Sequence, residues 1–391
     1  MQLTKIQVET LVAIRRDLHR QPELSGEETR TAETIAAHLA ALEPDRIVRG
    51  LGGAGVAAVF DSKRPGPSVM VRCELDGLPI RETGTAAYIS AIDGKGHQCG
   101  HDGHMAILLG VAALLRKRPA RGRAVLLFQP AEETGQGARA VVADPRFGDV
   151  RCDYAIALHN LPGHPTGLVI LKEGHVNCAS RGMRIRLTGK TAHAAQPETG
   201  VSPAQGLANI IRDLDALTRV GGADADFSLV TIVHASLGEK AFGVSPAQAE
   251  IWATLRTVTD RKMQDLVVAA EAIARREADR CGVAVEIAYD DIFDACENDA
   301  AVVAHMRDSA RGLGLAVEEL LAPLRFSEDF GTFGQTGASA MFFLGAGTDT
   351  PALHNPDYDF PDALIPTGAA MLHATMSALI GDNSAAPSGV D

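Results

Sequence analysis

The chain has 391 residues, 46% of them apolar and 22% charged, a composition typical of a soluble enzyme with one large or two ordinary domains. Its formal net charge of -12, without a cluster of basic residues, argues against nucleic acid or an anionic membrane as a partner. The six cysteines are scattered, no signal-peptide pattern opens the sequence, and no apolar run is long enough to span a membrane. We therefore expect a cytoplasmic location, where thiols stay reduced.

The first part of the chain alternates between helical and strand patterns. Apolar stripes predict two helices between Lys5 and Leu42, and Ser25 with Glu28 resembles a capping box at the start of the second. A strong helix is expected over 105–117. Nearly continuous apolar runs, as in buried parallel strands, lie at 55–60, 68–75, 123–130 and 154–160. This alternation predicts an α/β fold, with a mostly parallel sheet and helices on both faces.

The pattern changes near Ser180. Segments in which apolar and polar residues alternate predict half-exposed strands, separated by two helical segments, in the order 181–189, helix 201–219, 227–236, 248–257, helix 260–281 and 283–291. The order β-α-β-β-α-β is that of a ferredoxin-like module. The first pattern then returns, with a helix over 299–313, a strand over 339–345, a helix over 367–380 and a polar tail expected to be frayed. We expect a larger α/β domain formed by 1–179 and 294–391, with a small domain inserted over 180–293.

Potential metal ligands occur where such a sheet would build a site. The segment HQCGHDGH places Cys99 two residues before His101, and the adjacent Glu132 and Glu133 follow a predicted strand. Further imidazoles are at His159 and His354. Any one of these residues is more often an ordinary core or surface residue, but together they lie beside strand ends or Gly/Pro-rich turns. They exceed what one tetrahedral site needs, which indicates two divalent metals that share a ligand.

Such a site favours hydrolysis of an amide or an ester. A metal lowers the pKa of bound water, and a neighbouring carboxylate can pass the proton to a leaving nitrogen. Two adjacent glutamates permit one to act as a ligand and the other as a base. The sequence contains neither a G-x-S-x-G elbow nor a P-loop, so serine hydrolase and kinase functions have little support.

An ordered set of motifs resembles the dinuclear metal-dependent aminoacylase and carboxypeptidase family. The branch most similar comprises the hippurate hydrolases and the auxin-conjugate (indoleacetyl-amino acid) hydrolases. The motifs extend over nearly the whole chain: RRDLHRQPELSGEE, VRCELDGLPI, HQCGHDGHMAILLG, LLFQPAEETGQGA, ALHNLP, GKTAHAAQPETGVSP, SEDFGTFG and LHNPDYDF.

The resemblance implies a role for each matching residue. The metal ligands would be Cys99, His101, Glu133, His159 and His354, with Cys99 as the bridge. Glu132 would be the general base, and Asp76 would orient the site from behind the ligands. His193 would reach the partner subunit's active site and stabilise the oxyanion. The resemblance also implies that the larger domain is catalytic and that the inserted domain is a lid. It implies a homodimer formed through this lid domain, or a higher oligomer, with two divalent ions per subunit. Zn²⁺ and Mn²⁺ are the first candidates, and Co²⁺ and Ni²⁺ also suit the ligands.

Three positions depart from the family's pattern. Glu198 stands where a histidine is frequent, Gly243–Pro246 reads GVSP instead of NVIP, and Glu74 replaces an aspartate. None of these changes removes a metal ligand or the base. Arg256 could pair with a substrate carboxylate, and a lid salt bridge is an equal alternative. The remaining histidines near these motifs are interpreted as structural: His97, His104, His164, His175 and His234.

Three functions remain open at this point. The first is hydrolysis of N-acyl amino acids, small molecules such as hippurate-like or N-acetyl conjugates. The second is a dipeptidase or a deacetylase of an N-acetylated diamino acid with the same site. The third is a catalytically inactive binding protein, against which the intact ligand set and Glu132 argue.

Overall fold

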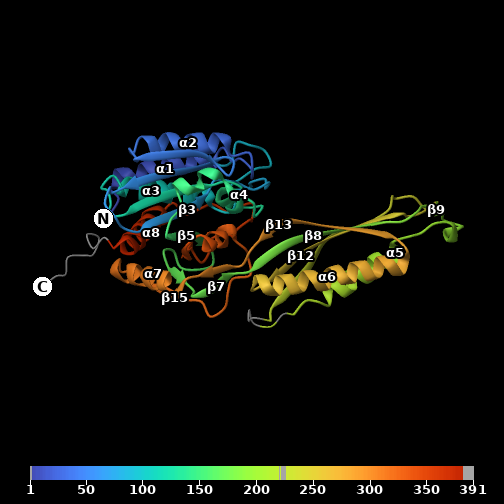
Figure 1. Ribbon diagram of the computed structural model, residues 1–391. Helices are drawn as coiled ribbons and strands as arrows, with labels where there is room; N and C mark the ends of the chain where they lie inside the picture. Colours follow the sequence, from blue (N-terminus) through green and yellow to red (C-terminus); the bar gives the residue numbers. More distant parts are fainter. Residues whose placement is uncertain (1, 220, 222–225, 382–391) are drawn as a thin grey trace. The chain divides into compact units, whose positions relative to one another are not determined.

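The structure is a computed structural model that describes residues 2–219, 221 and 226–381 (Figure 1). The polar tail beyond these residues lies outside the description. The chain forms two compact units. The first comprises the residues up to Val176, Glu297–Leu321 and the residues from Asp329 onward, and the second comprises Asn177–Cys296 and Ala322–Glu328. The segment Ala322–Glu328 thus belongs to the second unit, whereas the sequence pattern had assigned it to the larger domain.

The first unit is built on an eight-stranded sheet. Its strands follow the order β1 (Arg46–Leu51), β2 (Gly55–Asp61), β4 (Arg123–Gln129), β3 (Ser68–Glu74), β5 (Tyr154–Leu161), β16 (Ala338–Gly345), β6 (Val169–Leu171) and β15 (Val317–Glu319). The central strands β4, β3, β5 and β16 are parallel to one another, and β1, β2 and β6 introduce antiparallel pairs. The prediction of a mostly parallel α/β sheet is confirmed.

Helices cover both faces of this sheet. One face packs against α1 (Lys5–His19), α2 (Thr29–Ala40), α3 (His101–Leu114), α7 (Ala300–Gly312) and α8 (Leu364–Ile380). The first three lie next to one another in blue to teal in Figure 1. The other face meets α4 (Gly137–Ala143) and the 3₁₀ helices η1 (Pro145–Asp149) and η3 (Asp329–Gln335). Because side chains alternate along a strand, Val71 and Cys73 of β3 face the large core, while Arg72 and Glu74 point to the opposite face.

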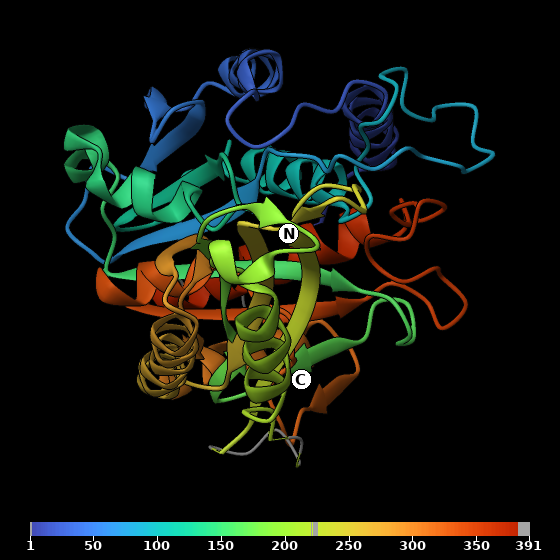
Figure 2. The same cartoon turned by 90° about the vertical axis from the view of Figure 1, so that its right-hand side faces the viewer.

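The second unit has the topology expected of a ferredoxin-like module. Its antiparallel sheet has the order β10 (Ser228–Leu237), β12 (Gln248–Thr257), β8 (Ala179–Thr188) and β13 (Ala284–Phe293). The helices α5 (Ala204–Asp215) and α6 (Asp260–Cys281) lie together on one face, as Figure 2 also shows. The short strands β9 (Ala192–His193) and β11 (Val244–Ser245) pair with each other, and the 3₁₀ helix η2 spans Pro197–Thr199. The remaining pair, β7 (Gly174–Asn177) with β14 (Cys296–Asn298), belongs mostly to the first unit.

The N-terminal ends of the helices correct one prediction. The capping box expected at Ser25 and Glu28 is absent, because α2 begins after Glu28 without a side-chain cap. A capping box occurs instead at α1, where Thr4 and Gln7 bond each other's backbone N–H groups. The Ser25 hydroxyl donates to the carboxylate of Asp76, 51 positions further along the chain. Among the described residues, no helix is both long and apolar enough to cross a bilayer.

Candidate metal centre

The sequence-predicted site residues of the first unit converge at one edge of its sheet. Asp76 follows β3, Glu132 and Glu133 follow β4, and His159 lies near the end of β5. These three strands are parallel neighbours, so their carboxyl ends meet at the same edge, where open α/β sheets bind ligands. Cys99 and His101 come from the start of α3, and His354 from the loop between β16 and α8.

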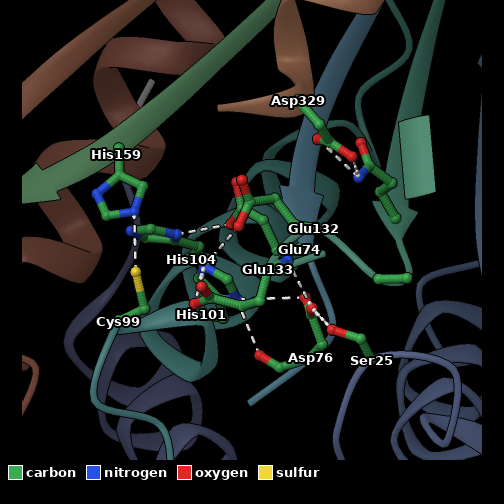
Figure 3. Close-up of polar contacts among 12 residues, drawn as sticks. Ser25, Glu74, Asp76, Cys99, His101, His104, Glu132, Glu133, His159 and Asp329 are labelled. Atoms are coloured by element: carbon green, nitrogen blue, oxygen red, sulfur yellow. Dashed lines mark hydrogen bonds and ion pairs between the residues drawn. The ribbon is translucent and has the colours of Figure 1, made fainter. Parts of the chain in front are cut away.

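Potential ligand atoms form two groups that share the Cys99 thiol. One group is Cys99, His101 and His159, and the other is Cys99, Glu133 and His354; within each group the ligand atoms lie within 4.8 Å of one another. Figure 3 shows the Cys99 thiol beside His159, with Sγ and Nε2 3.3 Å apart. The two oxygens of Glu133 lie 3.8 Å from His101 Nε2 and from His354 Nε2. The arrangement suits two cations with one common thiolate.

Two of the imidazoles are held in the form that binds a metal. The Nδ1–H of His101 donates to the backbone oxygen of Asp76 at 2.8 Å, and that of His159 donates to the backbone oxygen of Asn160 at 2.7 Å. In the neutral form of each ring, the lone pair is therefore on Nε2. A hydrogen bond at the second nitrogen is the usual means of fixing the tautomer and the orientation of a histidine ligand.

Asp76 links three segments of the site. Its Oδ2 accepts from the Ser25 hydroxyl at 2.7 Å and from the backbone N–H of Glu133 at 2.9 Å (Figure 3). Its backbone oxygen holds His101. These contacts are those expected of a carboxylate that orients the ligands, although the role of Asp76 stays a prediction. Sequence patterns gave no signal for the Ser25 contact, since the two residues meet only through the tertiary fold.

The electrostatics of the site favour positive charge. Burial alone would lower the pKa of His101, but Asp76, Glu74 and Glu133 raise it to about 10. Burial raises the pKa of the Glu133 carboxyl to about 7, although the nearby His101 opposes this shift. Carboxylates thus surround the His101 imidazole. Such an environment stabilises a cation.

The residues present fit a pair of divalent cations. Among the described residues, the buried atoms His101 Nε2 and Glu133 Oε1 have no hydrogen-bond partner. Buried polar atoms without a partner are costly, and coordination of a cation would satisfy both. A thiolate, imidazoles and carboxylates form a mixed S, N and O ligand set that suits zinc and neighbouring transition metals.

A charged network behind the ligands was missed by sequence reasoning. Arg72 pairs with Glu74 and, at 2.6 Å, with Asp329, and Gln129 donates to both carboxylate oxygens of Asp329. Glu74 also bonds Nδ1 of His104 at 2.7 Å. The pairing with Arg72 and His104 holds the pKa of Glu74 well below its usual range despite burial. The departure at Glu74 therefore retains a carboxylate with two defined partners.

Two residues beside the ligands have left-handed backbone conformations. Ala131, directly before Glu132, has φ 50°, and its N–H donates to the buried carboxylate of Glu28 at 2.7 Å. His354 has φ 66°, and its N–H donates to the backbone oxygen of Gln98 at 2.9 Å. Such conformations are unfavourable for residues with a Cβ and persist where surrounding contacts enforce them, often at functional sites.

His193 and Arg256 belong to the second unit. His193 lies on β9, is exposed, and its Nδ1 accepts the backbone N–H of Ala195 at 3.0 Å. Arg256 lies on β12, where its Nη1 donates to the Ser327 hydroxyl at 2.9 Å and to the backbone oxygen of Arg325 at 3.1 Å. These bonds tie Arg256 to the segment Ala322–Glu328. Its part in substrate binding stays a prediction.

Comparison with known proteins identifies the family. The model of peptidase family M20/M25/M40 matches residues 70–378. An N-acetylcysteine deacetylase of Bacillus subtilis (strain 168) is 29% identical over 374 residues, which cover 95% of this chain and 96% of that protein. An IAA-amino acid hydrolase of Arabidopsis thaliana is 28% identical over 393 residues, covering 96% of this chain and 88% of that protein. The crystal structure of a dinuclear metal-binding peptidase of the M20 family from Bacillus subtilis superposes with a TM-score of 0.81 at 25% identity, covering 97% of this chain and 100% of that one.

The chain belongs to peptidase family M20/M25/M40. This membership confirms the family and the enzyme class predicted from the motifs, that of a metal-dependent amidohydrolase. The two ligand groups that share Cys99 and the dinuclear relative support divalent metal binding.

We predict that Cys99→Ala lowers the bound-metal content and the activity together, because a shared thiolate serves both cations. Metal analysis after dialysis against a weak chelator measures the effect. Cys152→Ala is the matched control, since Cys152 is also buried but lies before β5, where its thiol contacts Ser68. Two tightly held ions in the Cys99→Ala protein would show that the thiol does not bridge.

Proposed function

We propose that this protein hydrolyses the amide bond of N-acyl amino acids at the site formed by the two ligand groups. The observation that carries the proposal is the sharing of Cys99 by these groups, with Glu132 beside them as a second carboxylate. Membership of a hydrolase family supports the same chemistry, as do the activities for which two relatives are named, deacetylation of N-acetylcysteine and hydrolysis of IAA-amino acids.

The proposed cofactors are two divalent ions per subunit, Zn²⁺ or Mn²⁺, with Co²⁺ and Ni²⁺ as further candidates. Cys99, His101 and His159 would hold one ion, and Cys99, Glu133 and His354 the other. When bound, such ions polarise the substrate carbonyl and lower the pKa of a coordinated water. The residues themselves supply orientation, because Asp76 and Asn160 fix the rings of His101 and His159.

The geometry supports a division of labour between the two glutamates. Glu133 is near three other potential ligands, Cys99, His101 and His354. Glu132 Oε2 lies 3.9 Å from His101 Nε2, and Glu132 belongs to neither of the two groups that contain Cys99. We therefore assign to Glu132, as part of the proposal, the transfer of a proton from the attacking water to the leaving nitrogen.

His193 is proposed to donate a hydrogen bond to the oxyanion in the neighbouring subunit. Because its Nδ1 accepts a backbone N–H, the neutral ring carries its proton on Nε2 and presents it as a donor. A homodimer through the second unit is part of this proposal. The strand β10 is an edge of its sheet, and exposed apolar side chains gather on and after it: Val233, Leu237, Phe242 and Val244. Unpaired edges of this kind invite pairing with another chain.

A cytoplasmic location is also proposed. All six cysteines lie within the described residues and are free thiols. Six free cysteines are more typical of a reducing compartment than of an oxidising one.

The direct test is a panel of N-acyl amino acids assayed for amine release with each of the four metals. The panel contains N-acetyl, benzoyl and indoleacetyl conjugates together with simple dipeptides. We expect hydrolysis of the acyl conjugates.

Glu132→Gln should reduce turnover by about 100- to 10,000-fold, because an amide cannot accept the proton. The variant should keep both metals, whereas Glu133→Gln, the matched change at the neighbouring position, should lose metal. Turnover near the wild-type rate in Glu132→Gln, or loss of its metals, would show that the roles are misassigned.

The partner-subunit role of His193 predicts complementation. His193→Ala alone should depress turnover strongly, while its metal content and thermal unfolding stay as in the wild type. When His193→Ala and Glu132→Gln proteins exchange subunits, one site of each heterodimer combines an intact base with an intact histidine from the other chain. Part of the activity should then return. Two differently tagged chains, isolated together by pull-down, confirm that heterodimers have formed. Heterodimers without activity would contradict a role in trans.

A further inference from the structure

Asn160 supports two of the ligand candidates at once. It follows the ligand candidate His159 on β5 and is fully buried. Its backbone oxygen accepts from Nδ1 of His159 at 2.7 Å, and its side-chain Nδ2 donates to the backbone oxygen of Cys99 at 2.7 Å. One residue thus fixes the ring of one ligand and the backbone of another, which lies 61 positions away in the chain.

The orientation of the Asn160 amide is determined by its neighbours. The Tyr358 hydroxyl donates to Oδ1 at 2.6 Å. His104 directs its Nδ1–H to Glu74, so its Nε2 is an acceptor, and the backbone N–H and Nδ2 of Asn160 both lie 3.1 Å from it. A reversed amide would place Oδ1 against two acceptors, Cys99 O and His104 Nε2, which is unfavourable.

The backbone next to Cys99 packs closely against this amide. Gly100 follows Cys99 with φ 87°, a conformation that favours glycine. A Cβ at this position would lie 2.6 Å from Asn160 Nδ2 and 2.9 Å from the Tyr358 hydroxyl. The backbone that carries the thiol is therefore seated directly on the Asn160–Tyr358 pair.

We propose that Asn160 is a positioning residue that sets the placement of Cys99 relative to His159, with Tyr358, His104 and Glu74 holding its amide in one orientation. This inference rests on the metal centre of the proposed function. It also explains why His104 and Glu74, although close enough to His101 to form a third group of potential ligands, serve as supports. The His104 nitrogens are engaged with Glu74 and Asn160.

The test compares Asn160→Ala with a matched truncation at Asn298. Asn298 is buried in the same unit, and its amide makes equivalent bonds of 2.8 to 2.9 Å to the backbones of Met341 and Lys172. Both variants leave backbone groups without their side-chain partner, so both should lose stability. We expect only Asn160→Ala to weaken Zn²⁺ or Co²⁺ binding, by about 10- to 100-fold in chelator competition, as is usual for partners of metal ligands.

The Co²⁺-loaded proteins provide a readout other than activity. The absorption bands of bound Co²⁺, including the thiolate-to-cobalt band, should shift in Asn160→Ala and remain as in the wild type in Asn298→Ala. Tyr358→Phe removes one hydroxyl and leaves the amide in place. It should weaken binding in the same direction by a smaller factor, and it decides the matter if Asn160→Ala does not fold.

The outcomes separate this inference from the proposed function. Wild-type affinity and spectra in both Asn160→Ala and Tyr358→Phe would overturn the positioning role while leaving the metal centre intact. Equal losses of affinity in Asn160→Ala and Asn298→Ala would overturn it too, because the effect would then be one of general destabilisation. A wild-type protein that binds neither ion would overturn the proposed function together with this inference.

Discussion

The need to balance buried negative charge governs the organisation of the first unit. Glu74 and Asp76 carry fully buried carboxylates to the region around His101, and the half-buried Glu133 adds a third. An uncompensated buried charge costs several kcal/mol. Arg72 balances the charge of Glu74, and His104 donates a hydrogen bond to it. The Ser25 hydroxyl and a backbone N–H satisfy Asp76. The negative charges of the Glu133 carboxylate and the Cys99 thiolate would be balanced by divalent cations.

The fold brings this charge together through three parallel strands with adjacent carboxyl ends. Two residues at this edge have left-handed backbone conformations, and each donates its N–H to a distant segment: Ala131 to the Glu28 carboxylate and His354 to the Gln98 carbonyl. The sheet positions these segments. The hydrogen bonds that hold the left-handed residues then fix the direction of the ligands beside them. Second-unit residues such as His193 are held by their own local strand pair, β9 with β11.

Much of this architecture could be predicted from local patterns. Apolar periodicity identified the long strands and helices, because burial of one face or of both faces imposes a period along the chain. Metal-ligand residue types such as Cys99 and Glu133 were found because their chemistry is distinctive. Short strands such as β1 and β15 were missed, because a strand of only a few residues does not show a clear apolar periodicity. Ser25 was assigned to a helix cap, whereas its partner Asp76 is brought to it only by the tertiary fold. Asn160 was not singled out for the same reason, and His104 was interpreted as structural without its partners.

The most direct test of the metal centre is anomalous diffraction from crystals loaded with Zn²⁺, recorded on both sides of the zinc absorption edge. We expect two peaks per subunit, about 3.5 to 4 Å apart as in other two-metal sites, with the Cys99 Sγ bonded to both. Glu133 and His354 should contact one ion, and His101 and His159 the other. A single peak, or two peaks without Cys99 between them, would contradict the shared-thiolate centre on which the proposed hydrolysis depends.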